Sequence, residues 1–533
     1  MYKRLCKAKK PNSAVPGDVP KKILKEFTCE LSNPLTVIFN SILRTLDYPR
    51  QWVIEYQIPI PKVTPPESLD DLRNIAKTAF ASKVFESFLA DWLLPIVKPY
   101  IDPCQYGLKG TSVTHYLVKL LKFIHTFIDL HIPHAVALAM IDLSKAFNRV
   151  SHQIVLEDLH NMKVPSWLLR ILSSYLTGRT MILSYGPVSS SPRPLPGSSP
   201  QGAFLGIFLF IVKFNAASIR PAIPREYLNC PLKQTKCRKD DCVKHRKDIH
   251  ALYIDDLSEL EAINLKEQLV TDLQNRPLPL NFHERFGKVL KDDSTLQKNL
   301  TKIQNFTLNN RMKINEKKSK VMLFNMSKSL DFPPEFKFKD GDFLEVLTET
   351  RLLGVQLHRN LKWDSNTGIL YKKAMKKMWL IRRMKILGLE ANIILEYYLK
   401  EIRPLTEHGV VAWNSGLTKS QSKQIEKIQK VAFKIILSHK YQTYEAACKS
   451  LCLPTLSQRR TKLCINFAVN LFRSSRRDEF FTVLKQKPTT RGKQKLVLEE
   501  ISRTSRNYNA PHNYLSRLVN ENSERILKNW TYE

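Results

Sequence analysis

The spacing of hydrophobic residues divides the first 365 residues into short strands and helices. Strict alternation in "WVIEYQIPIPKV" (52–63) predicts a half-buried strand, and the nearly continuous apolar run "AVALAMIDL" (135–143) predicts a strand buried on both faces. Further strand-like runs are "ALYIDDL" (251–257), "KSKVMLF" (318–324) and "TRLLGVQL" (350–357). Helical or continuous apolar runs predict helices at 81–97, 166–176 and 203–212. This part of the chain is therefore expected to be a mixed α/β body.

After Trp363 the pattern changes to helical spacing throughout. Hydrophobic residues recur with lysine and arginine between them, at Ala374, Met378, Ile381, Met384 and Leu387. Helical patterns continue to about residue 473, and the last sixty residues are polar and basic. We therefore expect an N-terminal extension (1–44), a mixed body (45–360), a basic helical module (361–473) and a basic C-terminal tail (474–533).

The charge balance points to a polyanionic partner. The 533 residues include 84 Lys and Arg against 49 Asp and Glu, a formal net charge of +35. Nucleic acid suits this excess better than a membrane, because the longest apolar run (203–212) is about half the roughly 20 residues of a membrane span. Nine scattered cysteines favour a reducing compartment. We expect an intracellular protein of the nucleus or cytoplasm that is neither secreted nor bound to a membrane.

Three aspartates interrupt or end apolar strands. Asp142 closes the buried strand at 135–143, and Asp255 and Asp256 stand side by side in "ALYIDDL". If the two strands are neighbours in one sheet, the three carboxylates meet at its edge and repel one another unless cations are bound. Two Mg²⁺ ions held about 4 Å apart would turn such a cluster into a phosphoryl-transfer site. For an adjacent pair taken alone, a solvated turn is the alternative.

A series of motifs occurs in a specific order between residues 12 and 475. They are "PIPK" (59–62), "DLRNIAKTAFASKVFE" (71–86), "QYGLKGTSVTHYL" (105–117), "AMIDLSKAFNRVSH" (139–152), "SSPQGAFLGIFLF" (198–210), "YIDD" (253–256), "NNRMKINEKKSKVMLF" (309–324) and "TRLLGVQLHRNLKW" (350–363). The series resembles the reverse transcriptase of a non-LTR (LINE-type) retrotransposon. The resemblance implies an α+β right-hand polymerase, with fingers, a palm containing an antiparallel sheet, and an all-α thumb.

The resemblance also implies roles for individual residues. Asp142, the carbonyl of Leu143, and Asp255 would bind two Mg²⁺ (or Mn²⁺) ions, and Asp256 would complete the acidic cluster. Lys62, Arg73, Phe147, Gln201 and Gly202 would contact the incoming nucleotide, with the Phe147 ring excluding a ribose 2′-hydroxyl. Lys318 would protonate the leaving pyrophosphate, with Lys317 and Lys320 as alternatives. Leu353 and Gly354 would hold the primer strand.

Two further points concern features outside this series. Cys230, Cys237, Cys242 and His245 lie in a basic stretch with the spacing C-x6-C-x4-C-x2-H. They are either zinc ligands or reduced side chains on an inserted loop. The matched series also starts close to Met1, so we expect an endonuclease activity to come from elsewhere.

The expected function is RNA-directed DNA polymerisation by two-metal nucleotidyl transfer. The partners would be an RNA template, a DNA primer or target, and deoxynucleoside triphosphates. One alternative is an RNA-dependent RNA polymerase, against which Phe147 and "PQG" argue. The other is a non-catalytic, nucleic-acid-binding relic of a mobile element, against which the three intact aspartates argue.

Overall fold

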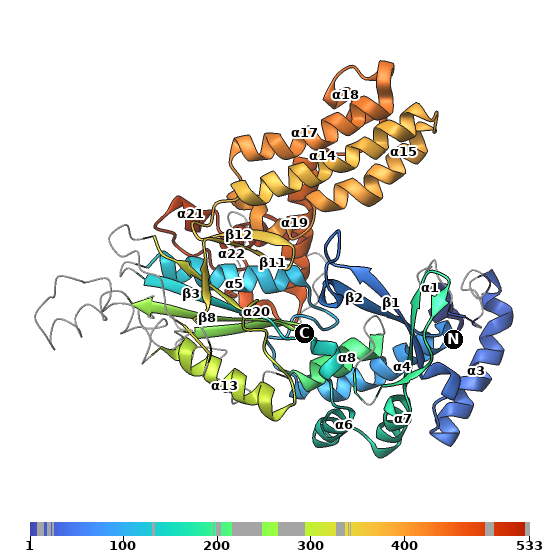
Figure 1. Cartoon of the computed structure of the whole chain (residues 1–533). Helices are drawn as coiled ribbons and strands as arrows, with labels where there is room; N and C mark the ends of the chain where they lie inside the picture. Colours follow the sequence, from blue (N-terminus) through green and yellow to red (C-terminus); the bar gives the residue numbers. More distant parts are fainter. Residues whose placement is uncertain are drawn as a thin grey trace, which may run out of the picture.

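The computed structural model shows an α+β body from which a group of helices projects (Figure 1). The described residues are 1–7, 15–16, 18, 23, 26–130, 134–195, 197–198, 204–215, 248–264, 294–326, 336–338, 341, 343–484 and 495–527.

The body is organised around a central sheet of five strands. Their order is β10–β9–β3–β8–β7, with the bounds β3 His134–Ile141, β7 Asp248–Tyr253, β8 Asp256–Asn264, β9 Lys320–Phe324 and β10 Glu345–Leu347. Strand β3 lies in the middle and pairs antiparallel with β8 on one side and β9 on the other. Strands β7 and β8 form a hairpin. The runs predicted to be strands at 135–143, 251–257 and 318–324 are thus neighbours in one sheet.

Strand β3 contributes to two hydrophobic cores because its side chains alternate between the faces of the sheet. Ala135, Ala137 and Ala139 face one core, which includes residues of α13 (Thr295–Asn309) and α8 (Phe204–Lys213). Val136 and Leu138 face the other core, which includes α5 (Val113–Ile128). Figure 1 shows α5 and α13 on opposite sides of the sheet. Burial on both faces explains the continuous apolar sequence of this strand.

A second, smaller sheet and several helices complete the body. The small sheet has the order β2–β1–β4–β5, with β6 also paired to β4. Its strands are β1 Ile54–Pro61, β2 Leu72–Lys77, β4 Thr180–Tyr185, β5 Val188–Ser189 and β6 Arg193–Pro194. Further helices of the body, within the described residues, are α1 Tyr2–Lys7, α3 Thr28–Thr45, α4 Phe80–Val97, α6 His152–Asn161 and α7 Ser166–Leu176. The predicted helices at 81–97, 166–176 and 203–212 are confirmed by α4, α7 and α8.

A two-stranded hairpin leads from the body into the projecting helices, which we call the helical arm (residues 364–450). The hairpin consists of β11 Glu349–Leu352 and β12 Val355–His358. The main helices of the arm are α14 Asp364–Ile386, α15 Ala391–Tyr397, α17 Lys419–Leu437 and α18 Tyr444–Ser450, and α16 Val410–Trp413 lies at its base. The arm has its own core, in which Ala374, Met378 and Ile381 of α14 are buried as predicted. Leu387, the residue after the end of α14, is instead 77% exposed.

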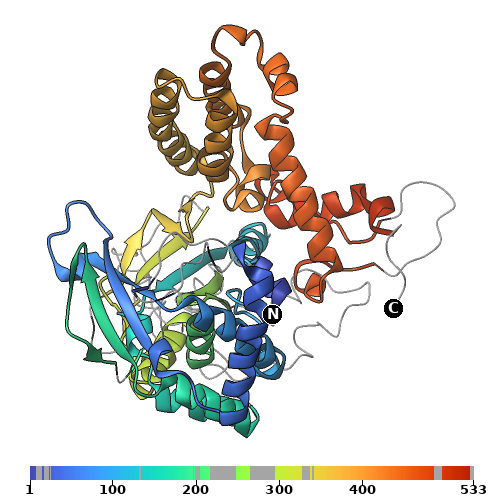
Figure 2. The same ribbon diagram turned by 90° about the vertical axis from the view of Figure 1, so that its right-hand side faces the viewer.

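The C-terminal region returns to the body, contrary to the predicted tail. Helix α19 (Leu456–Arg473) runs from the arm toward the body, where α20 Arg477–Phe480, α21 Ser505–Tyr508, α22 Pro511–Glu521 and α23 Ser523–Leu527 follow (Figure 2). Leu515, Leu518 and Val519 of α22 are buried in the same core as α5. The prediction of a tail was wrong for residues 495–527. The buried residues of this region do have helical spacing, but they are few and lie among many polar residues, so the sequence pattern did not reveal the helix. Among the described residues, every helix is too short or too polar to cross a membrane.

Candidate functional site

The three predicted carboxylates lie at one edge of the central sheet. Tyr253 of β7 pairs with Asp256 of β8, so Ile254 and Asp255 form a two-residue turn between the strands. Ile141, the last paired residue of β3, lies opposite Leu257 of β8. Asp142 therefore follows β3 at the position beside Asp256, as the sequence predicted. We call Asp142, Asp255 and Asp256 the carboxylate cluster.

The loop before β9 holds Asp142 in place. The backbone N–H of Asp142 donates to Ser319 Oγ at 3.1 Å, and the N–H of Asn315 donates to the Asp142 carbonyl at 2.7 Å. The Asn315 side chain also hydrogen-bonds to the Asp142 carboxylate. Leu143 forms a bridge with Ile314, which leaves Leu143 buried. The sequence offered no direct signal for Asn315 and Ser319, because both are common loop residues.

The electrostatics of the carboxylate cluster favour bound cations. Burial raises the pKa of Asp142, and the nearby Lys318, Asn315 and Lys62 only partly oppose this. Burial and then the charge of Asp142 raise the pKa of Asp255, while Arg73 opposes them. Desolvation, followed by the charges of Asp255 and Asp142, raises the pKa of Asp256 to about 6. These three carboxyl groups are difficult to ionise at the same time, and cations bound between them would stabilise their ionised forms.

We expect Asp256→Asn to stabilise the metal-free protein at high pH. The pKa of Asp256 is about 6 in the folded protein and about 4 in the unfolded chain. Ionisation therefore costs folding free energy that appears as the pH rises from about 4 through about 6 and persists above that. In EDTA the variant should melt above wild type at pH 8, with a difference that vanishes near pH 4, as measured by thermal denaturation.

Magnesium should act against this difference in melting temperature, and this response distinguishes a cation site from a surface carboxylate that binds no cation. Mg²⁺ should raise the Tm of wild type more than that of Asp256→Asn at pH 8. The exposed residue Asp47, which accepts a hydrogen bond from Ser174, supplies the matched control Asp47→Asn. Equal melting temperatures of wild type and Asp256→Asn at every pH would contradict the assigned pKa.

Two basic residues of the small sheet lie near the carboxylate cluster. Lys62 follows β1 and Arg73 lies on β2, and the N–H of Lys62 donates to the carbonyl of Asp71 at 2.7 Å. The charge of Lys62 acts on Asp142, and that of Arg73 acts on Asp255. Both side chains are exposed. The structure thus brings together the carboxylates and two of the predicted nucleotide-binding residues.

The three candidate lysines of the loop before β9 have different surroundings. Lys318 lies close enough to Asp142 for its charge to lower the pKa of that carboxyl. Lys320 instead forms an ion pair with Glu345 of β10. The side chain of Lys317 is exposed. These surroundings favour Lys318 as the lysine that faces the site.

Phe147 lies in the short 3-10 helix Ala146–Arg149, directly after the segment that carries Asp142. Its half-buried ring stacks on Phe210 of α8, with ring centroids 4.6 Å apart and an interplanar angle of 26°. This stack restrains the position of the ring, and its predicted contact with the sugar stays a prediction. Gln201 and Gly202 lie outside the described residues, so their predicted contact with a nucleotide stays a prediction.

Leu353 and Gly354 form the turn between β11 and β12. Both have positive φ, 45° and 88°. His408 belongs to the helical arm, and its Nε2 lies 2.8 Å from the carbonyl oxygen of Leu353. A Cβ atom on Gly354 would lie 2.7 Å from that same nitrogen, so glycine is needed here. The predicted primer-holding turn is therefore tied to the base of the helical arm.

The predicted zinc ligands Cys230, Cys237, Cys242 and His245 also lie outside the described residues. Within the described ranges, Asp102, Cys104 and His250 form the single set of three potential ligands whose atoms lie within 4.8 Å of one another. His250 Nε2 lies 2.7 Å from Asp102 Oδ2, and the N–H of Cys104 donates to Oδ1 at 2.6 Å. Burial raises the pKa of the Cys104 thiol to about 12. We interpret the set as a hydrogen-bonded group that fixes residues 102–104 beside β7.

The geometry of the site and the charge of the chain indicate the class of protein. A sheet edge with three mutually repelling carboxylates, flanked by exposed cationic side chains, suits divalent cations and a phosphate-bearing substrate. The net charge of +35 indicates that the protein also binds a larger polyanion.

Comparison with known proteins then identifies the family. Residues 60–357 match the family described as Reverse transcriptase (RNA-dependent DNA polymerase). The chain is 24% identical over 416 residues to the probable RNA-directed DNA polymerase from transposon BS of Drosophila melanogaster, covering 76% of this chain and 41% of that relative. It is 27% identical over 211 residues to the RNA-directed DNA polymerase from mobile element jockey of the same species, covering 38% and 23%. It is 29% identical over 180 residues to the probable RNA-directed DNA polymerase from transposon X-element, also from D. melanogaster, covering 33% and 20%.

The chain belongs to the reverse transcriptase family, since the match covers more than half of its length. The prediction of a reverse transcriptase of the non-LTR retrotransposon type is confirmed. The chain spans about two-fifths or less of the length of these curated relatives.

Proposed function

We propose that this chain is an RNA-directed DNA polymerase that extends a primer 3′-hydroxyl with deoxynucleotides on an RNA template. The small sheet would form the fingers, the central sheet the palm, and the helical arm the thumb. The observation that carries the proposal is the carboxylate cluster at the edge of the central sheet, with Lys62, Arg73 and Lys318 close to it.

The residues at this edge suit two divalent cations, Mg²⁺ or Mn²⁺. Asp142 and Asp255 would hold them, with the carbonyl of Leu143 as a further ligand and Asp256 adding negative charge. When bound, the cations would lower the pKa of the attacking hydroxyl and neutralise charge on the phosphates. The raised pKa values of all three carboxyls support this assignment: burial raises each of them, and neighbouring carboxylates add to the shifts of Asp255 and Asp256.

The remaining residues would bind and orient the substrates. Lys62 and Arg73 would contact the triphosphate through charge-assisted hydrogen bonds. The stacked Phe147 ring would lie under the sugar and leave no space for a 2′-hydroxyl. Attack of the primer oxygen on the α-phosphate breaks the bond to the β-phosphate, and Lys318 would donate a proton to the departing pyrophosphate.

The helical arm offers a surface for the nucleic-acid strands. Helix α14 presents exposed cationic side chains along one side, at Lys372, Lys373, Lys376, Arg382 and Arg383. The guanidinium of Arg383 lies over the ring of Trp379, 5.6 Å from its centroid, and that ring is 61% exposed. Exposed cations and an aromatic ring together favour phosphate contacts and base or sugar stacking.

Primer extension on poly(rA)/oligo(dT) with Mg²⁺ and dTTP tests the proposed function. The purified chain should extend the primer, and EDTA should stop the extension. Salt-sensitive RNA binding without any extension, across Mg²⁺ and Mn²⁺ concentrations, would contradict polymerase activity and leave a nucleic-acid-binding protein.

Among the three neighbouring lysines, we expect Lys318 alone to have a large effect on the rate. Lys318→Ala should lower kcat about 100-fold, because the leaving pyrophosphate loses its proton donor. Lys317→Ala and Lys320→Ala, the matched controls, should stay within about twofold, with Lys320→Ala losing only an exposed ion pair. Single-turnover extension with saturating dTTP measures the effect. A larger loss in either control would reassign the proton donor.

A further inference from the structure

A short segment before α5 extends the central sheet beside β7. Gln105 forms a parallel bridge with Leu252. The N–H of Tyr106 donates to the Leu252 carbonyl at 2.7 Å, and the N–H of Leu252 donates to the Cys104 carbonyl at 3.0 Å. The segment 104–107 therefore runs along the strand that ends in the turn of the carboxylate cluster.

The side chain of Gln105 reaches that turn. It is 3% exposed, and its Oε1 accepts hydrogen bonds from the N–H groups of Ile254 at 2.9 Å and Gly107 at 2.8 Å. Its Nε2 donates to the carbonyl of Ile254 at 3.4 Å. One buried amide thus engages both polar backbone groups of Ile254, the residue directly before Asp255.

The turn needs such support because its backbone is strained. Ile254 has a φ of 60°, a conformation that β-branched residues rarely adopt. Tyr253 and Ile254 also line a cavity of about 1090 Å³, so the turn has space to move on that side. A Cβ atom on Gly107 would lie 2.7 Å from Ile254 Cγ1 and 2.9 Å from Gln105 Oε1, which explains the glycine two residues after Gln105.

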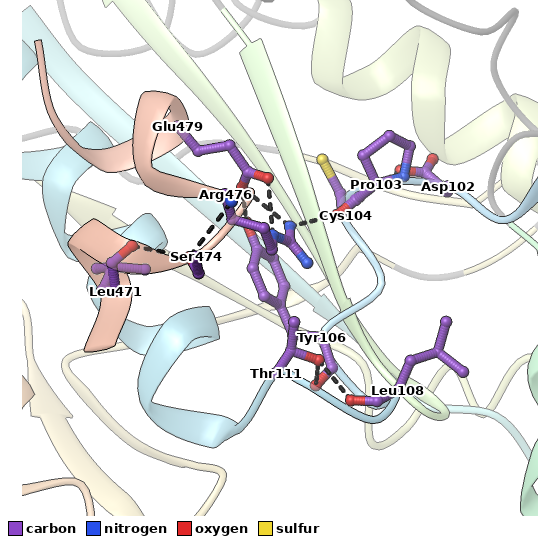
Figure 3. A network of polar contacts seen from close by, with 10 residues as sticks. All are labelled: Asp102, Pro103, Cys104, Tyr106, Leu108, Thr111, Leu471, Ser474, Arg476 and Glu479. Atoms are coloured by element: carbon purple, nitrogen blue, oxygen red, sulfur yellow. Dashed lines mark hydrogen bonds and ion pairs between the residues drawn. The ribbon is translucent and has the colours of Figure 1, made fainter. Parts of the chain in front are cut away.

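The segment that carries Gln105 is itself anchored by the C-terminal region (Figure 3). The Tyr106 hydroxyl donates to Glu479 Oε2 at 3.3 Å, and the Arg476 guanidinium lies 4.5 Å from the centre of the Tyr106 ring. Arg476 also forms a two-point ion pair with Glu479 and donates to the carbonyl of Pro103. Gln105 consequently extends from a fixed backbone and cannot simply follow a displaced turn.

We propose that Gln105 is a positioning residue for the reaction: its amide holds the strained Ile254–Asp255 turn so that the Asp255 carboxylate stays in place. The inference rests on the proposed function, since it assigns Asp255 a role in the reaction. Gln105 acts through the backbone of Ile254 and does not itself touch the substrate.

Gln105→Leu tests the proposal by removing all three hydrogen bonds at similar volume. We expect kcat to fall about 10- to 100-fold, as for a misplaced reacting group, with the KM for dTTP and primer–template affinity within about twofold. Amide hydrogen exchange in peptides covering residues 251–256 should become at least about tenfold faster. The Mg²⁺ concentration for half of the maximal Tm shift should also rise, in the absence of any nucleotide.

Gln429→Leu is the matched control, because Gln429 is another buried amide with several hydrogen bonds. It accepts from Tyr398 at 2.7 Å and donates to Tyr444 and to the Pro454 carbonyl, all within or next to the helical arm. This variant should lose stability but keep wild-type exchange at residues 251–256 and the wild-type Mg²⁺ midpoint. Equal changes in both variants would show a general loss of stability and overturn the proposal.

A second substitution covers the case in which Gln105→Leu does not fold. Gln105→Asn keeps an amide but is one methylene shorter, so it should also free the turn. Wild-type exchange at 251–256 in a folded Gln105 variant would overturn the positioning role, even if the chain is an active polymerase. Absence of polymerase activity in wild type would instead contradict the proposed function, while the exchange and Mg²⁺ measurements would still report on the turn.

Discussion

Asp255→Asn will lower the rate of deoxynucleotide incorporation by at least about 1000-fold while leaving binding of primer–template within a fewfold of wild type. The substitution keeps the shape of the side chain and removes the charge at the tip of the β7–β8 hairpin. Loss of one preorganised charge-stabilising group typically costs a factor of 100 to 1000, and loss of a cation ligand adds to this. Single-turnover extension on poly(rA)/oligo(dT), together with filter binding of the same substrate, measures both quantities.

The control for this experiment is Asp47→Asn, an exposed carboxylate in the loop between α3 and β1. It removes the same charge from the chain at a position away from the central sheet, and we expect an unchanged rate. Thermal denaturation in EDTA should show that Asp255→Asn is folded, and more stable than wild type at pH 8, because burial and Asp142 raise the pKa of the native carboxyl. A folded variant that retains more than about a tenth of the wild-type rate would exclude Asp255 as a cation ligand.

Phe147→Ala will relax the choice of sugar. In wild type the ring packs against Phe210, and in the proposed function it would leave no space for a 2′-hydroxyl. Alanine opens this space, and we expect the ratio of kcat/KM for UTP to that for dTTP to rise about 10- to 100-fold. Competition between the two nucleotides in one extension reaction measures the ratio directly.

Phe147→Tyr is the conservative comparison, because it keeps the ring that is proposed to block the sugar and should preserve the wild-type ratio. Asn148→Ala, at the exposed neighbouring position, controls for disturbance of the short helix. If Phe147→Ala incorporates UTP and dTTP in the wild-type ratio, the ring does not select the sugar and Phe147 is only a packing residue.

The sequence was most informative where one physical rule determines the pattern. The apolar run 135–143 is the pattern expected of a strand covered on both sides, and adjacent aspartates are poor strand formers that suit the tip of a tight hairpin. The strand is confirmed by β3, and the aspartate pair lies at the tip of the β7–β8 hairpin, with Asp255 in the turn and Asp256 as the first residue of β8. The place of Asp142 beside that turn followed once the two strands were assumed to be neighbours.

Other parts of the site depend on contacts between segments far apart in the chain. The hydrogen bonds of Gln105 reach across 149 positions to Ile254, and no local pattern distinguishes a buried glutamine from a surface one. Likewise, Lys318 and Lys320 are equivalent in the sequence, and the structure separates them, because Lys318 acts on Asp142 while Lys320 pairs with Glu345. The C-terminal helices were missed because their few buried residues pack on α5, about 400 positions earlier in the chain.

The return of the chain through α19 gives the helical arm two attachments instead of one. Glu426 of α17 accepts hydrogen bonds from the N–H groups of Leu456 and Ser457, which fixes the start of α19 to the arm. At the other end Phe472 is buried in the core that includes α5. A helix of 18 residues is about 27 Å long and does not stretch. Helix α19 therefore anchors the base of the arm along its whole length, because Leu456 at its start, Ala468 in its middle and Phe472 near its end are all buried in the core that includes α5.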